Sequence, residues 1–134
     1  MAKLEDIEGI GKRYANKLRK GGVRSQNALL ETGCTKSGRK NIATECGVTE
    51  KQVLNWVNRA DLGRIKGVST QYADLLECVG VDSVPEMAQR NAENLRTKME
   101  KVNNRKSLVR QLPSVSQVTD WVKQCKKMKK VVKH

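Results

Sequence analysis

The residues with the clearest chemical potential lie at positions 9–13, where two glycines flank an isoleucine and two cations follow. Glycine accepts the positive φ angles of a tight turn and lets other groups approach the backbone closely. A helix that begins directly after such a turn presents unpaired backbone N–H groups, which bind phosphate together with the positive end of the helix dipole. We therefore predict a nucleic-acid-binding site made of Gly9, Gly11, Lys12, Arg13 and Lys17.

A second version of this run stands 58 residues later and is less suited to phosphate. It reads Gly67-Val68-Ser69, and the uncharged pair Thr70-Gln71 replaces the two cations. A serine at this position is a good helix cap, so the second copy keeps a structural role while its electrostatic role weakens. Possible secondary contacts are Gly67, Ser69, Lys126, Lys127, Lys129 and Lys130.

The similarity between these runs extends into an internal repeat, which fixes the architecture before any local feature is considered. At the same offset of 58, the pairs are Ile7 with Ile65, Tyr14 with Tyr72, Leu18 with Leu76 and Gly22 with Gly80. We expect these tyrosines, and Trp56 and Trp121, to be core anchors rather than stacking platforms for bases. The predicted organisation is a first unit over residues 1–60, a second over 61–122, and a basic tail over 123–134 that continues the last helix or is disordered.

Glycine, proline and capping residues predict where the helices begin and end. Phenylalanine is absent and aromatic residues are scarce, which favours packed helices over a sheet. The fold class is therefore all-α, with tandem helix-hairpin-helix repeats forming a compact helical domain. Helices are expected over 3–7, 12–20, 61–65 and 70–79, and others begin at Ser25, at Thr49 with a Gln52 capping box, at Ser83, and at Ser114 or Ser116.

The composition also bears on location and on cofactors. No apolar run approaches the roughly 20 residues that cross a bilayer, and the N-terminus lacks the apolar core of a secretory signal. We expect a soluble intracellular protein, cytoplasmic or in the nucleoid or nucleus, without membrane insertion. Widely spaced cysteines and a single histidine, His134, predict reduced, mostly buried thiols, no metal site and no cofactor. The four cysteines are Cys34, Cys46, Cys78 and Cys125.

The positive charge is unevenly distributed along the chain. The net charge is +13; residues 1–60 carry 12 basic against 6 acidic side chains, residues 61–122 carry 9 against 8, and the last twelve residues carry six lysines without an acid. A basic surface favours polyanions such as nucleic acid, acidic proteins or anionic lipid. The first repeat and the tail are therefore the expected sites of polyanion contact.

Three features together resemble a known family: the two glycine hairpins, the Gly-Val motifs with a following serine at Gly22 and Gly80, and the junction from Trp56 to Leu62. They resemble a prokaryotic-type family of tandem helix-hairpin-helix proteins catalogued as a domain of unknown function. The resemblance covers residues 4 to about 127. It implies an all-helical structure related to the DNA-binding helix-hairpin-helix superfamily, and a phosphate role only at positions that match the motif.

The leading functional hypothesis is non-enzymatic, sequence-independent binding of nucleic acid, DNA in the first place. The sequence lacks a group of Arg, Asn or Gln side chains arranged for base readout. The alternative is a helical interaction or structural module that docks on an acidic protein or within a larger ribonucleoprotein or cytoskeletal assembly. Catalysis is not expected, because no internal histidine, clustered acid pair or nucleotide-binding loop is present.

Overall fold

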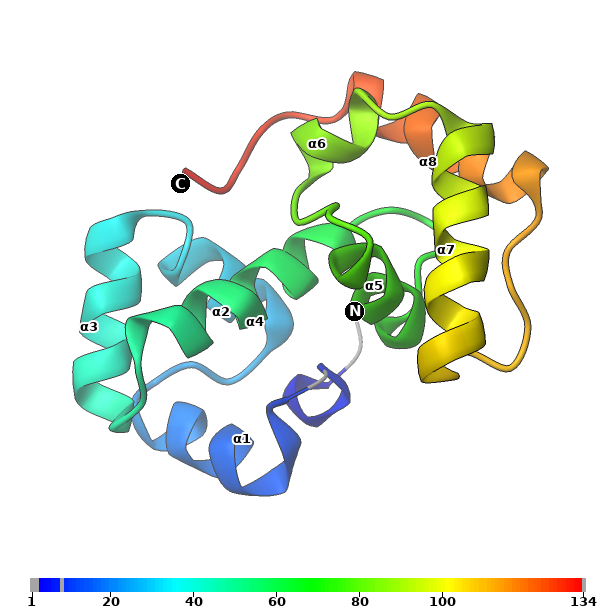
Figure 1. Cartoon of the computed structure of the whole chain (residues 1–134). Coiled ribbons are helices and arrows are strands. Elements are labelled where there is room, and N and C mark those ends of the chain that lie inside the picture. Colours follow the sequence, from blue (N-terminus) through cyan, green and yellow to red (C-terminus); the bar gives the residue numbers. More distant parts are fainter. Residues whose placement is uncertain (1–2, 8, 134) are drawn as a thin grey trace. The chain divides into compact units, whose positions relative to one another are not determined.

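The computed structural model describes residues 3–7 and 9–133, and the chain divides into two compact units. The first unit comprises Met1–Asp61 and Val131–His134, and the second comprises Leu62–Lys130. Every regular element in the described residues is helical, which confirms the predicted all-α class (Figure 1). None of these helices combines the length and the apolar composition that crossing a membrane requires.

The first unit contains a short 3-10 helix and four α-helices, and polar side chains cap most of their N-termini. Ser25 Oγ accepts the N–H of Ala28 at 3.0 Å, and Thr49 and Gln52 form the predicted capping box through two bonds of 3.0 and 3.1 Å. Such caps satisfy backbone donors that a helix leaves unpaired. The elements are η1 (Leu4–Asp6), α1 (Gly11–Lys20), α2 (Gln26–Thr32), α3 (Lys36–Cys46) and α4 (Glu50–Leu62), which ends at the first residue of the second unit.

The second unit contains four α-helices in a similar order. Ser83 caps α6, and Ser114, rather than Ser116, caps α8 in a reciprocal capping box with Gln117. Helix α8 packs against α6 and α7, and α7 also packs against α5. The elements are α5 (Thr70–Cys78), α6 (Val84–Ala88), α7 (Ala92–Lys106) and α8 (Val115–Lys127).

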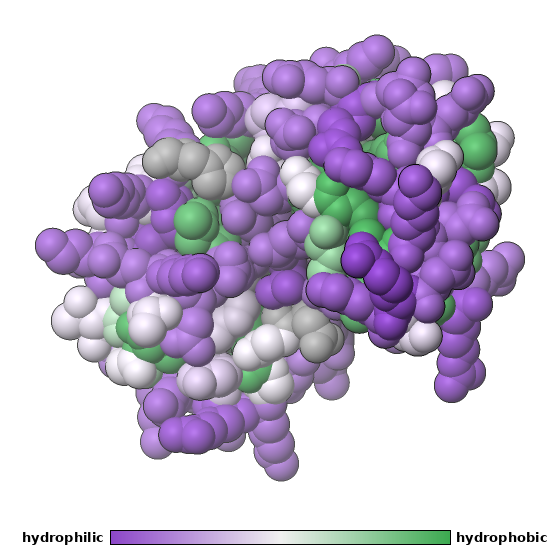
Figure 2. All heavy atoms as spheres, viewed as in Figure 1, coloured by the Kyte–Doolittle hydropathy of each residue, from purple (hydrophilic) through white to green (hydrophobic). Residues whose placement is uncertain are grey.

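Each unit has its own hydrophobic core, and each core contains one tryptophan. Trp56 packs with residues of η1 and of α1 to α4, whereas Trp121 packs with residues of α5 to α8. Each ring also meets the tyrosine of its own unit, with centroids 5.4 Å apart in both the Tyr14–Trp56 and the Tyr72–Trp121 pair. On the face shown in Figure 2, hydrophilic side chains cover most of the surface and hydrophobic residues show only as small patches.

The backbone geometry of the two units matches at the offset found in the sequence. The N–H of Ile10 bonds to the carbonyl of Ile7 at 3.1 Å, and Val68 bonds to Ile65 at the same distance. The turn glycines that follow these isoleucines also agree, with φ of 91° at Gly9 and 93° at Gly67. The segment expected as a separate helix over 61–65 differs, because α4 continues to Leu62 and only turns follow it.

The later parts of the units differ in length, which explains why the two tryptophans are 65 residues apart instead of 58. Helix α7 has 15 residues where α3 has 11, and the connection after it is five residues longer than the one after α3. Helix α6 is two residues shorter than α2. The net difference is seven residues, and each of the four α-helices of the first unit has a counterpart among the four of the second.

The C-terminal segment is helical at its start and non-helical after it. Helix α8 continues the basic run only to Lys127, and the residues after Met128 are not helical. Val132 is 2 % exposed and belongs to the core of the first unit. The sequence predicted a continued helix or a disordered tail over 123–134, whereas in the structure the helix ends at Lys127 and Val132 is buried in the first core.

Candidate nucleic-acid interface

The first hairpin is held in place by buried apolar residues on both sides of its turn. The N–H of Ile7 bonds to the carbonyl of Leu4 at 3.1 Å, and Ile10 then bonds to Ile7. All three of these side chains are buried in the core of the first unit. Gly9, between the isoleucines, has a φ of 91°, which side-chain-bearing residues rarely adopt. The turn is thus fixed by its apolar neighbours and by a glycine that its backbone requires.

Trp56 lies directly against this turn. A Cβ on Gly9 would stand 3.5 Å from Trp56 Nε1 and 4.0 Å from an Arg59 guanidinium nitrogen. The ring of Tyr14, in the first turns of α1, packs on the same tryptophan. The predicted role of Tyr14 and Trp56 as core anchors matches these contacts, because the two rings join the hairpin to α4.

Helix α1 begins at Gly11 without a side-chain cap at its N-terminus. The first N–H groups of a helix have no acceptor within the helix, so an uncapped first turn offers donors to an external group. Gly11 has a φ of 59°, and a Cβ added there would meet no atom within 4 Å. An open depression of about 470 Å³ lies at this helix start. Its lining includes Gly9, Gly11, Lys12 and Arg13, four of the five predicted site residues.

Two acidic residues also line the depression, and each is already engaged. Asp6 accepts the backbone N–H of Lys3 at 3.0 Å. Glu5 forms an ion pair with Arg19. Desolvation opposes ionisation of Glu5, but hydrogen bonds from its own backbone and from Arg19 outweigh it and lower the pKa of this carboxyl. Both carboxylates therefore satisfy local donors, and they share the lining of the depression with Lys12 and Arg13.

Some cations of α1 line the depression, and some lie over the ring of Tyr14. Lys12 and Arg13 are exposed and line the depression. Arg13 also lies over the Tyr14 ring, with its guanidinium carbon 6.0 Å from the centroid. Lys17 Nζ is 5.7 Å from the same centroid, and Lys17 is not part of the lining. Lys17 is thus the predicted residue that the structure does not bring to the depression.

The second hairpin satisfies its own donors. Ser69, the counterpart of Gly11, accepts the N–H of Tyr72 through its Oγ at 3.2 Å. The Gln124 side chain accepts the N–H of Lys66 at 2.8 Å and donates to the carbonyl of Lys66 at 3.0 Å. A Cβ on Gly67 would lie only 3.0 Å from Trp121 Nε1. The serine hydroxyl therefore occupies a donor that α1 leaves to an external group.

We expect replacement of Ser69 by alanine to destabilise the second unit by about 1 kcal/mol, because an N-terminal donor of α5 loses its acceptor. Urea denaturation followed by circular dichroism measures this change. Ser69→Asp is the matched control, since aspartate caps as well as serine and should preserve stability. An alanine variant as stable as the parent would show that this cap contributes nothing.

The lysines predicted as secondary contacts lie away from both hairpin turns in sequence. Lys126 and Lys127 form the last turn of α8, where positive charge favours the helix dipole. Lys129 and Lys130 follow the helix, and the carbonyl of Lys129 accepts a hydrogen bond from Arg64 at 3.0 Å. All four side chains are exposed. Their positions are compatible with contact to an anion and also with a purely structural role.

Sequence reasoning missed Gln124, which joins α8 to the second turn. A signal was available, because the tryptophan offset of 65 places Gln124 opposite Arg59, three residues after each tryptophan. The Gln124 amide pairs with the Lys66 backbone, and the Arg59 guanidinium lies beside the first turn. The difference between the hairpins thus extends from the turn itself to the helix behind it.

The four cysteines are not joined in disulfides, and their environments differ. Cys46 and Cys125 are buried as predicted, but Cys34 is half-buried and Cys78 is exposed, so the expectation of mostly buried thiols holds for two of the four. Burial, reinforced by Glu45, raises the pKa of the Cys46 thiol. Within residues 3–7 and 9–133, no three His, Cys, Asp or Glu side chains are grouped as metal ligands.

Comparison with known proteins adds a family to this geometry. A family model described as "Domain of unknown function (DUF4332)" matches residues 8–128, nearly the whole chain. The chain belongs to the DUF4332 family. The matched part of this DUF4332 chain includes both glycine turns and both tryptophans. No curated protein matches the chain, and no solved structure matches it either.

Proposed function

We propose that this DUF4332 protein binds nucleic acid, DNA in the first place, through phosphate contacts that do not depend on sequence and without catalysing a reaction. We further propose that its two units are tandem helix-hairpin-helix modules related to the DNA-binding superfamily of that name. Support for the second proposal comes from the glycine turns at Gly9 and Gly67, which share their φ angle and their flanking hydrogen bonds. This function implies an intracellular protein.

The observation that carries the binding proposal is the uncapped start of α1. Its first turn opens into a depression lined by Lys12 and Arg13, whereas the equivalent turn of α5 is capped by Ser69. An anion at a helix N-terminus gains both backbone hydrogen bonds and the favourable dipole. Backbone donors and cationic side chains contact phosphate and carry no base information. Binding by this site is therefore independent of sequence.

The surface favours a polyanion over an apolar partner. Among the described residues, Val115 is the large hydrophobic residue with an exposed side chain. Protein interfaces usually bury a cluster of apolar or aromatic anchors at their centre. An acidic protein remains the alternative partner, because it would also be attracted by the net charge of +13.

We expect affinity for duplex DNA to fall by about two orders of magnitude between 50 and 200 mM salt, if about four phosphates are contacted. Fluorescence anisotropy with two labelled duplexes of unrelated sequence measures this dependence, and the two should agree within about threefold if only the backbone is contacted. Competition by poly-glutamate as strong as by unlabelled DNA would favour the acidic-protein alternative. The proposal fails if neither duplex binds at 50 mM salt.

Neutralising two cations of the first hairpin tests the location of the site. In Lys12→Gln/Arg13→Gln, we expect the slope of log K against log salt to decrease by about two, since two phosphate contacts are lost. The matched control is Lys20→Gln/Arg24→Gln, which removes the same charge from exposed positions near the other end of α1. Equal effects of the two variants would mean that binding reflects net charge and not this site.

A further inference from the structure

Helix α7 carries a row of three cations, which we call the α7 basic face and define as Lys98, Lys101 and Arg105. They follow helical spacing of three and four residues and are exposed. Leu95 and Met99 bury a different part of the helix in the core of the second unit. Core packing thus fixes the direction in which the cations point.

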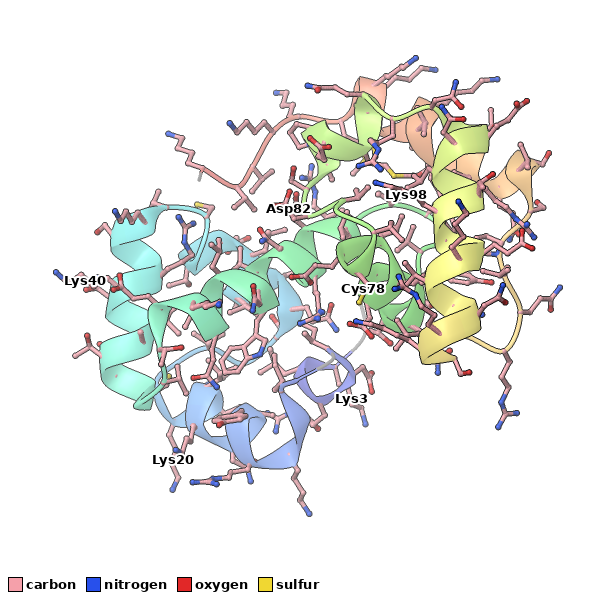
Figure 3. The ribbon with its side chains drawn as sticks, in the orientation of Figure 1. Lys3, Lys20, Lys40, Cys78, Asp82 and Lys98 are labelled. Atoms are coloured by element: carbon pink, nitrogen blue, oxygen red, sulfur yellow. The ribbon has the colours of Figure 1, made fainter. Side chains whose placement is uncertain are left out.

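A depression of about 340 Å³ lies along this face, next to the C-terminal end of α5. Three cations, Lys98, Lys101 and Arg105, line it together with Cys78, Val79 and Val102. None of these six residues is acidic. Figure 3 shows Lys98 and Cys78 on the same side of α7. The lining of the depression therefore combines apolar side chains with three cations.

The acidic residues of α7 lie on a different part of the helix surface. Glu100 is paired with Arg96 at 2.7 Å, a contact between residues four apart. By the helical period of 3.6 residues, Glu93 and Glu100 fall about 110–130° away from the centre of the cationic row. Residues 61–122 are nearly neutral in total, with 9 basic and 8 acidic side chains. Within α7, the basic and acidic side chains therefore lie on different parts of the helix surface, although the unit as a whole is nearly neutral.

We propose that the α7 basic face is a second contact for the phosphodiester backbone of a duplex nucleic acid. The proposal rests on the proposed function, since the partner is the same, but it assigns a site in the other unit. The seven residue steps from Lys98 to Arg105 span roughly 10 Å along the helix axis. A DNA duplex presents about one negative charge every 1.7 Å of its length, so several phosphates face such a row.

The charge pattern argues for a repeating anion over a single small one. The three lining cations are exposed and distributed along the helix, whereas a site for one small anion converges its donors on a point. A chain of phosphates satisfies a distributed row without that convergence. The second unit then contributes to affinity through α7, although its own hairpin is capped by Ser69.

Cys78 provides a local probe for this contact, because its exposed thiol lines the depression and lies 4.0 Å from Lys106 Nζ. The rate of alkylation by uncharged iodoacetamide, measured at Cys78 by peptide mass spectrometry, should fall at least about tenfold with saturating duplex DNA if the backbone covers the depression. Parallel measurements with duplex RNA decide which nucleic acid protects better. Unchanged reactivity under saturating DNA and RNA overturns the proposal, and equal protection by poly-glutamate also overturns it.

Matched variants separate this proposal from the proposed function. Lys98→Gln/Lys101→Gln/Arg105→Gln should abolish protection of Cys78, whereas Lys36→Gln/Lys40→Gln/Lys51→Gln, with the same change of charge at exposed positions of the first unit, should preserve it. If Lys12→Gln/Arg13→Gln lowers affinity while Cys78 stays reactive under DNA, only the α7 proposal fails. If Cys78 is protected while the hairpin variant binds normally, the first-hairpin proposal fails and the α7 contact stands.

Discussion

Replacing Trp121 with alanine should destabilise the second unit by about 3–5 kcal/mol, the cost of removing a large aromatic side chain from a packed core. Trp121 is 1 % exposed and packs against Tyr72 with ring centroids 5.4 Å apart. Its Nε1 also lies 3.0 Å from the position of a Cβ on Gly67, so the ring fills the space beneath the turn. The cavity would therefore weaken both the core and the support of the hairpin.

Urea denaturation of the variant, followed by circular dichroism, measures this loss. Trp121→Phe is the control, since it keeps an aromatic ring against Tyr72 and should lose clearly less stability than the alanine variant. Trp56 remains in both variants and reports the first unit by fluorescence. A loss below about 1 kcal/mol in Trp121→Ala would contradict the role of the ring as the central packing residue.

The parts of the fold that sequence predicted best depend on local rules. The turn at Gly9 follows from glycine between buried isoleucines, and the cap at Ser69 follows from a hydroxyl directly before a helix. The capping box at Ser114 is of the same kind. These features depend on residues within a few positions of each other, so their physical cause is visible in the sequence.

The features that the sequence did not predict depend on contacts between distant segments or on the side of a helix to which a residue belongs. The pairing of Gln124 with Lys66 joins residues 58 positions apart. The cationic row of α7 is not visible in the summed charge of the second unit, because the helix period separates basic from acidic residues by face. Lys17 was expected beside a phosphate, yet its position on α1 places it over the Tyr14 ring. Knowledge of the helix faces was needed in each case.

Removal of residues 131–134 should destabilise the first unit by about 3–5 kcal/mol, because this short segment supplies both apolar burial and hydrogen bonds. Val132 is 2 % exposed within the first core, and Val131 packs against the same core. The N–H of Lys133 donates to the carbonyl of Cys34 at 2.7 Å. The sequence predicted that this lysine-rich segment continues the last helix or is disordered. In the structure, its two valines pack against the core of the first unit.

Because of Arg39, truncation should cost more stability than the loss of the two valine side chains alone. Its side chain is 5 % exposed and donates to the carbonyls of Gly33 and Lys133, each at 2.8 Å. Truncation removes the second acceptor and leaves a buried guanidinium group with fewer partners, which is costly for a charge away from water. The C-terminal segment thus supplies one of the hydrogen-bond acceptors of the buried Arg39 guanidinium.

The measurement is urea denaturation monitored by Trp56 fluorescence in a Trp121→Phe background, which isolates the signal of the first unit. Lys133→Ala is the matched control, because its exposed side chain is removed while both backbone hydrogen bonds remain, and it should stay within about 0.5 kcal/mol of the parent. Val132→Asp should approach the effect of truncation, since it buries a carboxylate in an apolar core. An unchanged Trp56 transition in both the truncated chain and Val132→Asp would show that the segment contributes nothing to the first unit.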